Sequence, residues 1–277
     1  MLKNLVDVHW LKSKIDAKDL IILDSRSQLG SQDYGIEEYN KGHIPNAIFV
    51  SVEDVLTGSV QKHGGRHPLP DMSAFVKDME RMGVDDSSVV VVYDDGDLAM
   101  GGRLWWMLKY IGKKEVYLLA GGIDAWKKAG FEVDTINRSP KEKGSLTIEI
   151  NESIITTIDE VKTNQYREDA IIVDSRTEDR YRGEIEPIDR VPGHIPNSKN
   201  YPWTILTQDN MVRDVEFLKD HFKGLEKYEK IIVHCGSGIT GTVNFIFMEE
   251  VGLKPILYVG GYSDWISYDE NEIVKEV

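Results

Sequence analysis

The chain has 277 residues, a composition typical of a globular protein with one large or two ordinary domains, and a formal net charge of −14. This charge argues against DNA, RNA or an anionic membrane as a partner, because phosphates attract basic surfaces. No apolar run approaches the ~20 residues that span a bilayer, and residues 1–11 lack a signal-peptide segment, so we expect a cytoplasmic protein.

Short apolar runs alternate with helix-like segments along the chain. We expect buried strands at residues 19–23, 88–93, 116–119, 170–173, 230–234 and 256–259. Helices are expected at 73–82, 102–111 and 242–251. Alternating strands and helices predict an α/β fold with a mostly parallel sheet, in which ligands bind beyond the carboxyl ends of strands.

The sequence repeats itself once, in the same order. Asp-Ser-Arg occurs at 24–26 and 174–176, Gly-His-Ile-Pro at 42–45 and 193–196, and Gly-Gly at 121–122 and 260–261. Such ordered self-similarity predicts two copies of one fold. We place the first domain at 1–138, a charged linker with Pro and Gly at 139–151, and the second domain at 152–277.

The two copies differ where the sequence points to chemistry. An alignment of Gly112 with Gly252 places Asp95 on Cys235, the single cysteine of the chain. Cys235 directly follows an expected strand, and small residues separate it from the next helix. In such a loop, backbone N–H groups and the helix dipole favour a thiolate or a persulfide anion. We therefore predict that Cys235 is a nucleophile.

The chain resembles the tandem-domain rhodanese-like sulfurtransferases. The resemblance rests on the repeated Asp-Ser-Arg and Gly-His-Ile-Pro segments and on the loop Cys235-Gly236-Ser237-Gly238-Ile239-Thr240. It implies two rhodanese-like domains, each a mostly parallel sheet flanked by helices. The first domain, which carries Asp95 instead of cysteine, would be catalytically silent.

The loop also resembles that of the 3-mercaptopyruvate sulfurtransferases. Gly236 and Ser237 add no charge, whereas thiosulfate sulfurtransferases often carry cations there for a dianion. The resemblance implies that Arg180 and Arg190 bind the substrate carboxylate, for which paired guanidinium donors are suited. The other predicted substrate-binding residues form the loop around the transferred sulfur, namely Gly236, Gly238, Ile239 and Thr240.

Three further residues are predicted to take part in proton transfer. Ser237 is close to Cys235 in sequence and would relay a proton to the departing enolate of pyruvate. The resemblance places an acidic residue and a histidine of the first domain beside this loop, at Glu53 and His67. Glu53 would orient the Ser237 hydroxyl and hold a proton, and His67 would either bind the keto oxygen of the substrate or share the proton. No metal or organic cofactor is implied. An external thiol, thioredoxin or cyanide would accept the sulfur, since the chain has no second cysteine.

Two alternatives stay open. Thiosulfate is a possible donor in the same class of reaction, and a tandem module of this kind can serve as a non-enzymatic sulfur carrier or binding protein. A cysteine-dependent phosphatase is disfavoured, because position 241, where its phosphate-binding arginine would stand, is Gly241.

Overall fold

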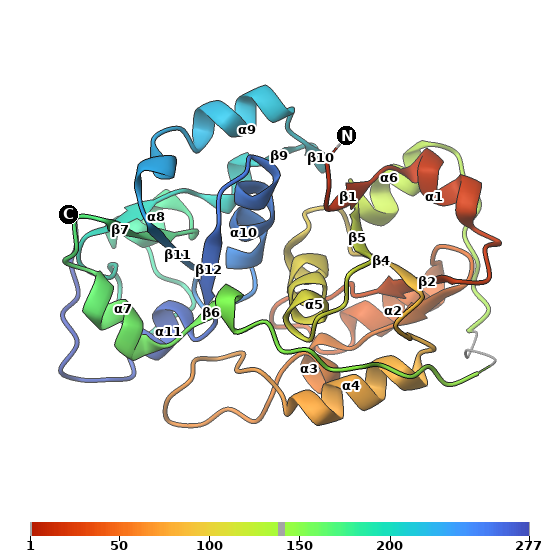
Figure 1. Ribbon diagram of the computed structural model, residues 1–277, viewed down its shortest axis with the longest axis horizontal. Helices are drawn as coiled ribbons and strands as arrows, with labels where there is room; N and C mark the ends of the chain where they lie inside the picture. The colour runs from red at the N-terminus through yellow and green to blue at the C-terminus, as the bar shows by residue number, and fades with distance from the viewer. Residues whose placement is uncertain (1, 138–141, 277) are drawn as a thin grey trace. The chain divides into compact units, whose positions relative to one another are not determined.

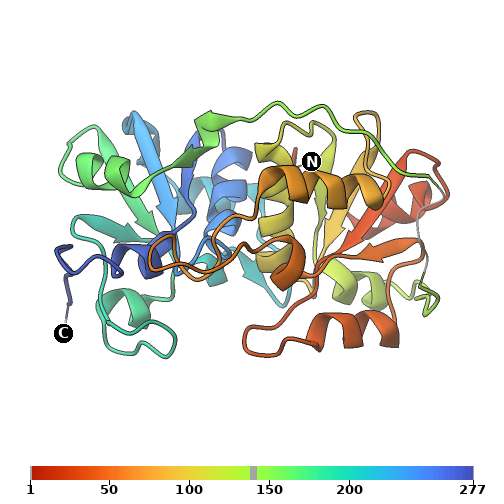
Figure 2. The same cartoon turned by 90° about the horizontal axis from the view of Figure 1, so that it is seen from below.

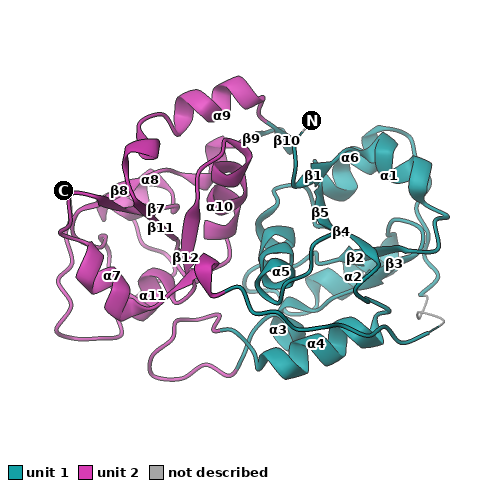
Figure 3. Ribbon diagram, in the orientation of Figure 1, with its two compact units in different colours: residues 1–58, 69–151, 207–212 teal, residues 59–68, 152–206, 213–277 magenta. Residues whose placement is uncertain are grey.

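The computed structural model describes residues 2–137 and 142–276, which form two compact units (Figure 3). Unit 1 comprises Met1–Gly58, Leu69–Asn151 and Thr207–Val212, and unit 2 comprises Ser59–Pro68, Glu152–Leu206 and Arg213–Val277. Residues 59–68 thus pack with unit 2 although they precede most of unit 1 in the sequence. This division differs from a single boundary at the expected 139–151 linker. Residues 139–141 of that linker lie outside the described residues, and residues 144–151 are hydrogen-bonded to unit 1.

The elements of both units appear in Figure 1. Those of unit 1 are β1 (Leu5–Val6), α1 (Val8–Lys14), β2 (Leu20–Asp24), α2 (Tyr34–Lys41), β3 (Ala47–Phe49), α3 (Val52–Val55), α4 (Met72–Arg81), β4 (Val89–Tyr93), α5 (Ala99–Tyr110), β5 (Val116–Leu119), α6 (Gly122–Lys128), β9 (Thr207–Gln208) and β10 (Met211–Val212). Those of unit 2 are β6 (Ile155–Thr156), α7 (Ile158–Asn164), β7 (Ala170–Asp174), α8 (Glu178–Arg182), β8 (Ser198–Asn200), α9 (Val215–His221), β11 (Lys230–His234), α10 (Gly241–Glu250), β12 (Pro255–Tyr258), α11 (Gly261–Trp265) and the 3-10 turns Glu152–Ile154, Trp203–Ile205 and Leu225–Lys227.

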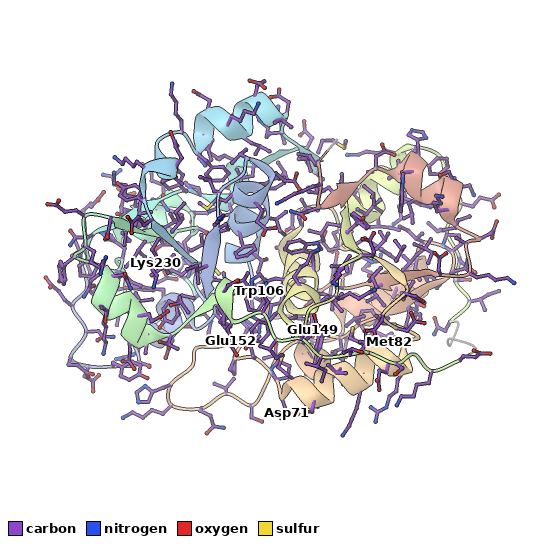
Figure 4. All side chains as sticks on the ribbon, viewed as in Figure 1. Asp71, Met82, Trp106, Glu149, Glu152 and Lys230 are labelled. Atoms are coloured by element: carbon purple, nitrogen blue, oxygen red, sulfur yellow. The ribbon has the colours of Figure 1, made fainter. Side chains whose placement is uncertain are left out.

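Unit 1 is built on a parallel sheet with the strand order β1-β5-β4-β2-β3. Helices α1, α2 and α6 cover one face, while α4 and α5 lie on the other (Figure 2). Strand β4 consists of four valines and a tyrosine, as expected for a strand that is buried on both faces. Trp106 on α5, labelled in Figure 4, is fully buried and belongs to the core, as its apolar surroundings in the sequence suggest.

Unit 2 repeats this topology with the order β6-β12-β11-β7-β8, again with parallel pairing. Helices α7 and α11 pack on one face, and α9 and α10 lie together on the other. The predicted fold class, two tandem α/β domains with parallel sheets, is confirmed. Each expected strand and helix is present, with ends that shift by up to three residues.

Candidate active site

Cys235 lies at the carboxyl end of β11, the central strand of the unit 2 sheet. It is a free cysteine and is 2% exposed. Residues 236–240 form a short loop, and α10 begins at Gly241. The first N–H groups of α10 and the positive end of its dipole face this loop, which favours an anion there.

The start of α11 holds the loop from the side. The backbone N–H groups of Tyr262 and Ser263 donate to the carbonyl oxygens of Cys235 and Gly236, each at 2.8 Å. Gly261 has φ +61°, and a Cβ at this position would lie 2.7 Å from the Cys235 oxygen. The close approach of the two segments therefore requires glycine here.

In unit 1 the counterpart of Cys235 is Asp94, so the prediction of Asp95 was wrong. The carbonyl oxygen of Asp94 accepts the N–H of Ile123 at 2.9 Å, just as that of Cys235 accepts the N–H of Tyr262 at 2.8 Å. Both residues also directly follow the strand that pairs with the strand ending in the repeated Asp. The alignment was anchored on glycines beyond the next helix, and the first copy has one extra residue in between.

The Asp94 side chain shows how backbone N–H groups of this type of loop converge on an acidic group. Its oxygens accept the backbone N–H groups of Gly96 at 2.9 Å, Leu98 at 3.2 Å and Gly101 at 2.9 Å. Burial raises the pKa of Asp94 and the charge of Asp97 adds to this effect, while the three N–H groups act against it. In unit 1 the loop is thus filled by its own carboxylate, whereas the equivalent residue in unit 2 is a thiol.

Ser237 and His67 lie together in unit 2, and their role in proton transfer stays a prediction. The Ser237 Oγ lies 2.7 Å from Nδ1 of His67. The segment that carries His67 is held against α11, because the Gly64 N–H donates to Asp264 Oδ1 at 2.7 Å and the Arg66 N–H donates to Ser263 Oγ at 3.1 Å. These contacts position residues 64–67 beside the cysteine loop.

A cluster of two guanidiniums and two carboxylates lies beside Gly236. Arg180 pairs through Nε with both oxygens of Glu186 at 3.0 Å and through Nη2 with Asp189 at 2.9 Å. Arg66 pairs with the other oxygen of Asp189. A Cβ on Gly236 would lie 2.9 Å from Arg66 Nη2, 3.5 Å from Arg180 Nη2 and 3.6 Å from an Asp189 oxygen. Burial lowers the pKa of Arg66, whereas Cys235 acts to raise it.

Arg190, the second arginine predicted to bind substrate, has different neighbours. Its guanidinium donates to the carbonyl oxygen of Ile266 and lies 3.5 Å from Asp269, and its side chain is 62% exposed. The structure does not bring it to the cluster at Gly236. Arg66 takes the position beside Arg180 instead.

The remaining predicted residues divide between the two units. Glu53 is an exposed residue on α3 of unit 1, where Ser27 donates a 3.3 Å hydrogen bond to its carboxylate. Its role in catalysis stays a prediction. Gly238 and Ile239 are buried in the cysteine loop of unit 2, and Thr240 is the N-cap residue of α10.

A buried ion pair supports the site from the neighbouring strand. Arg176 binds Asp174 through Nη2 at 2.6 Å and also contacts Glu186 through Nη1 at 3.2 Å. Burial alone would raise the pKa of Asp174, but the charges of Arg176 and His234 lower it to about 2. Arg176 also donates to the carbonyl oxygen of Gly193 at 2.8 Å, which ties the Gly-His-Ile-Pro segment to the strand end.

Comparison with known proteins identifies the family. The rhodanese-like domain family matches residues 7–129 and 157–268, once in each sequence repeat, and the chain belongs to this family. It is a tandem-domain rhodanese-like sulfurtransferase. It is 34% identical over 270 residues to the "Probable 3-mercaptopyruvate sulfurtransferase" of Pseudomonas aeruginosa, with 95% of each chain covered.

Two further relatives show the range of this similarity. The crystal structure of SseA from Escherichia coli, described as a 3-mercaptopyruvate sulfurtransferase with the rhodanese fold, superposes with a TM-score of 0.82 at 30% identity. The match covers 94% of this chain and 98% of that one. Thiosulfate/3-mercaptopyruvate sulfurtransferase 2 of Arabidopsis thaliana is 27% identical, with 97% of this chain and 86% of the relative covered.

Sequence reasoning missed Arg66, Glu186 and Asp189. Arg66 directly precedes His67 and follows two glycines, so the segment that pointed to the histidine also contained a signal for the arginine. The two carboxylates had no comparable signal. Their position beside Gly236 depends on how residues 183–193 fold back onto α8.

Proposed function

We propose that this sulfurtransferase takes sulfur from 3-mercaptopyruvate and passes it to a thiol acceptor through a persulfide on Cys235. The observation that carries the proposal is the pair of guanidiniums, Arg66 and Arg180, beside Gly236 and one residue from the buried thiol. A planar guanidinium matches a carboxylate with two donors. Since 3-mercaptopyruvate carries a carboxylate and a thiol on one short molecule, it can reach both the arginines and Cys235.

In the first half-reaction, the Cys235 thiolate attacks the sulfur of the substrate. The S–S bond forms, the C–S bond breaks, and its electron pair goes to the carbon, which gives the enolate of pyruvate. The sulfhydryl proton of the substrate ends on this carbon, so the products are pyruvate and a persulfide anion. Ser237 and His67, joined at 2.7 Å, would carry that proton.

The loop would then hold the persulfide anion until an acceptor arrives. The geometry at Asp94 supports this step, because three backbone N–H groups converge on the side-chain oxygens at the equivalent position of unit 1. An external thiol such as thioredoxin, or cyanide, attacks the outer sulfur and releases the Cys235 thiolate. None of the helices that the structure describes is long and apolar enough to cross a membrane. The cytoplasmic location stays a prediction.

Thiosulfate is the second candidate donor. It has support from the plant relative, whose name includes both donors. Against it stands the charge of the site, since Glu186 and Asp189 already compensate Arg66 and Arg180. A dianion would therefore gain less from these arginines than it would from free cations.

Steady-state kinetics with the two donors test the proposal. We expect a higher kcat/KM for 3-mercaptopyruvate than for thiosulfate, and Arg180→Ala should mainly raise the KM for 3-mercaptopyruvate. Arg167→Ala is the matched control, because Arg167 belongs to an exposed pair with Asp169 in the same unit and such pairs contribute little. If thiosulfate is the better donor of the unchanged enzyme, the assignment of 3-mercaptopyruvate is wrong.

A further inference from the structure

We propose that Asp189 is a resident counter-ion which the carboxylate of the donor must displace, and that it disfavours dianionic donors. The inference rests on the proposed function, because it concerns the same two arginines. It assigns a specificity-determining role to a residue of the segment between α8 and β8.

The carboxylate of Asp189 is placed as a substrate carboxylate would be. One oxygen accepts from Arg180 Nη2 at 2.9 Å, and the other pairs with Arg66. The side chain is only 2% exposed, so this is a built arrangement and not a surface pair. The Asp189 N–H donates to Glu186 Oε1 at 3.0 Å, which turns the segment so that the Asp189 carboxylate faces the arginines.

The surrounding charges are already balanced. Arg176 is bound by Asp174 and Glu186, and Arg180 by Glu186 and Asp189. The guanidinium of Arg66 is neutralised by Asp189, yet its Nε is buried without a hydrogen-bond partner among the described residues. Because this Nε is enclosed by protein, an incoming anion meets the guanidinium nitrogens that face Asp189 and Gly236.

Two carboxylates cannot occupy the same guanidinium donors at once. When the carboxylate of a donor binds, Asp189 must give up at least one of its contacts, and its charge stays close to the new anion. Because Coulomb repulsion scales with the charge of the ligand, a dianion loses about twice the free energy that a monoanion loses. Asp189 thus weakens the binding of both ligands and favours the monoanion.

Binding of two anions that carry no transferable sulfur tests this inference. Pyruvate serves as the monoanionic probe and sulfate as the dianionic probe, each titrated by calorimetry into the full-length protein. Asp189→Asn keeps the side-chain shape but removes its charge. It should tighten pyruvate binding about tenfold, the order expected when a like charge beside a ligand is removed, and sulfate binding by more.

Two further variants keep the result decisive. Asp189→Ser removes the charge with a smaller side chain and replaces Asp189→Asn if that protein does not fold. Asp220→Asn, at an exposed carboxylate on α9 of unit 2, should leave both affinities unchanged. Unchanged or weaker binding of both probes in the folded Asp189 variants would show that Asp189 merely holds the arginines in place, and would overturn the inference. If sulfate binding tightens but pyruvate binds to none of the proteins, the role of Asp189 stands and the proposed 2-oxo acid donor fails.

Discussion

Replacement of Ser237 by alanine separates a chemical role of its hydroxyl from a structural one. The change removes the oxygen that lies 2.7 Å from Nδ1 of His67. If this hydrogen bond only holds the loop, its loss costs about 1 kcal/mol, or roughly fivefold in kcat/KM. If the pair moves the proton to the enolate carbon, the loss in kcat should be about 10²–10⁴-fold. The proposed mechanism predicts the larger loss, with KM little changed.

The assay compares both sulfur donors with the same variant. Sulfite leaves thiosulfate without protonation of a carbon, so turnover of thiosulfate should fall by no more than about fivefold, the cost of the lost hydrogen bond. His67→Asn should behave like Ser237→Ala, and the double variant should lose little more than either single variant because the two groups act as a unit. Equal losses with both donors, or a loss with 3-mercaptopyruvate below the structural estimate, would refute the relay.

Further substitutions test the arginine pair and the buried charges. Arg66→Ala should raise the KM for 3-mercaptopyruvate about tenfold. Arg66→Lys should restore only part of the lost affinity, since lysine keeps the charge but lacks the paired donors of the guanidinium. An unchanged KM in Arg66→Ala would show that Arg66 does not bind the substrate carboxylate. Asp174→Asn should lower the free energy of unfolding by about 3–5 kcal/mol in a denaturant titration, because it leaves Arg176 buried without its main partner. The pKa of Asp174 is about 2 in the folded protein, below its value of about 3.9 in the unfolded chain. The ionised carboxylate therefore stabilises the fold above the unfolded pKa, and this stabilisation is lost as the pH falls through the folded pKa. Asp174→Asn should lack this acid-induced loss of stability. Asp95 has the opposite shift: burial raises its pKa to about 6, above the unfolded value of about 3.9. The stability that it contributes is therefore lost as the pH rises from about 4 through 6, and Asp95→Asn should flatten the fall in unfolding free energy over this range. Identical pH slopes for Asp95→Asn and the unchanged protein would contradict that assignment.

Local pattern was enough to predict the fold. Strands such as Lys230–His234 and Val116–Leu119 have the predicted bounds, because a short apolar run between turn residues has few other ways to bury its side chains. The repeated segments then implied two copies of one topology. The loop after the strand also pointed to Cys235, since the glycines there leave space for a backbone cradle.

Features that depend on tertiary contacts could not be predicted in this way. One extra residue between Asp94 and Gly112 shifted the counterpart of Cys235 from Asp95 to Asp94, and strand pairing rather than residue spacing reveals it. The family resemblance implied that Arg190 contacts the substrate, but its guanidinium donates to the carbonyl oxygen of Ile266. Residues 59–68 precede most of unit 1 in the sequence, and no local pattern shows that they pack with unit 2.

Intact-protein mass spectrometry after treatment with 3-mercaptopyruvate tests the central claim most directly. The account predicts that the protein becomes heavier by one sulfur atom, that the addition maps to Cys235, and that a thiol or cyanide removes it. Cys235→Ser should show neither the addition nor turnover. A full rate of sulfur transfer by Cys235→Ser, or turnover by the unchanged enzyme with no sulfur found on Cys235 when the acceptor is withheld, would contradict the account.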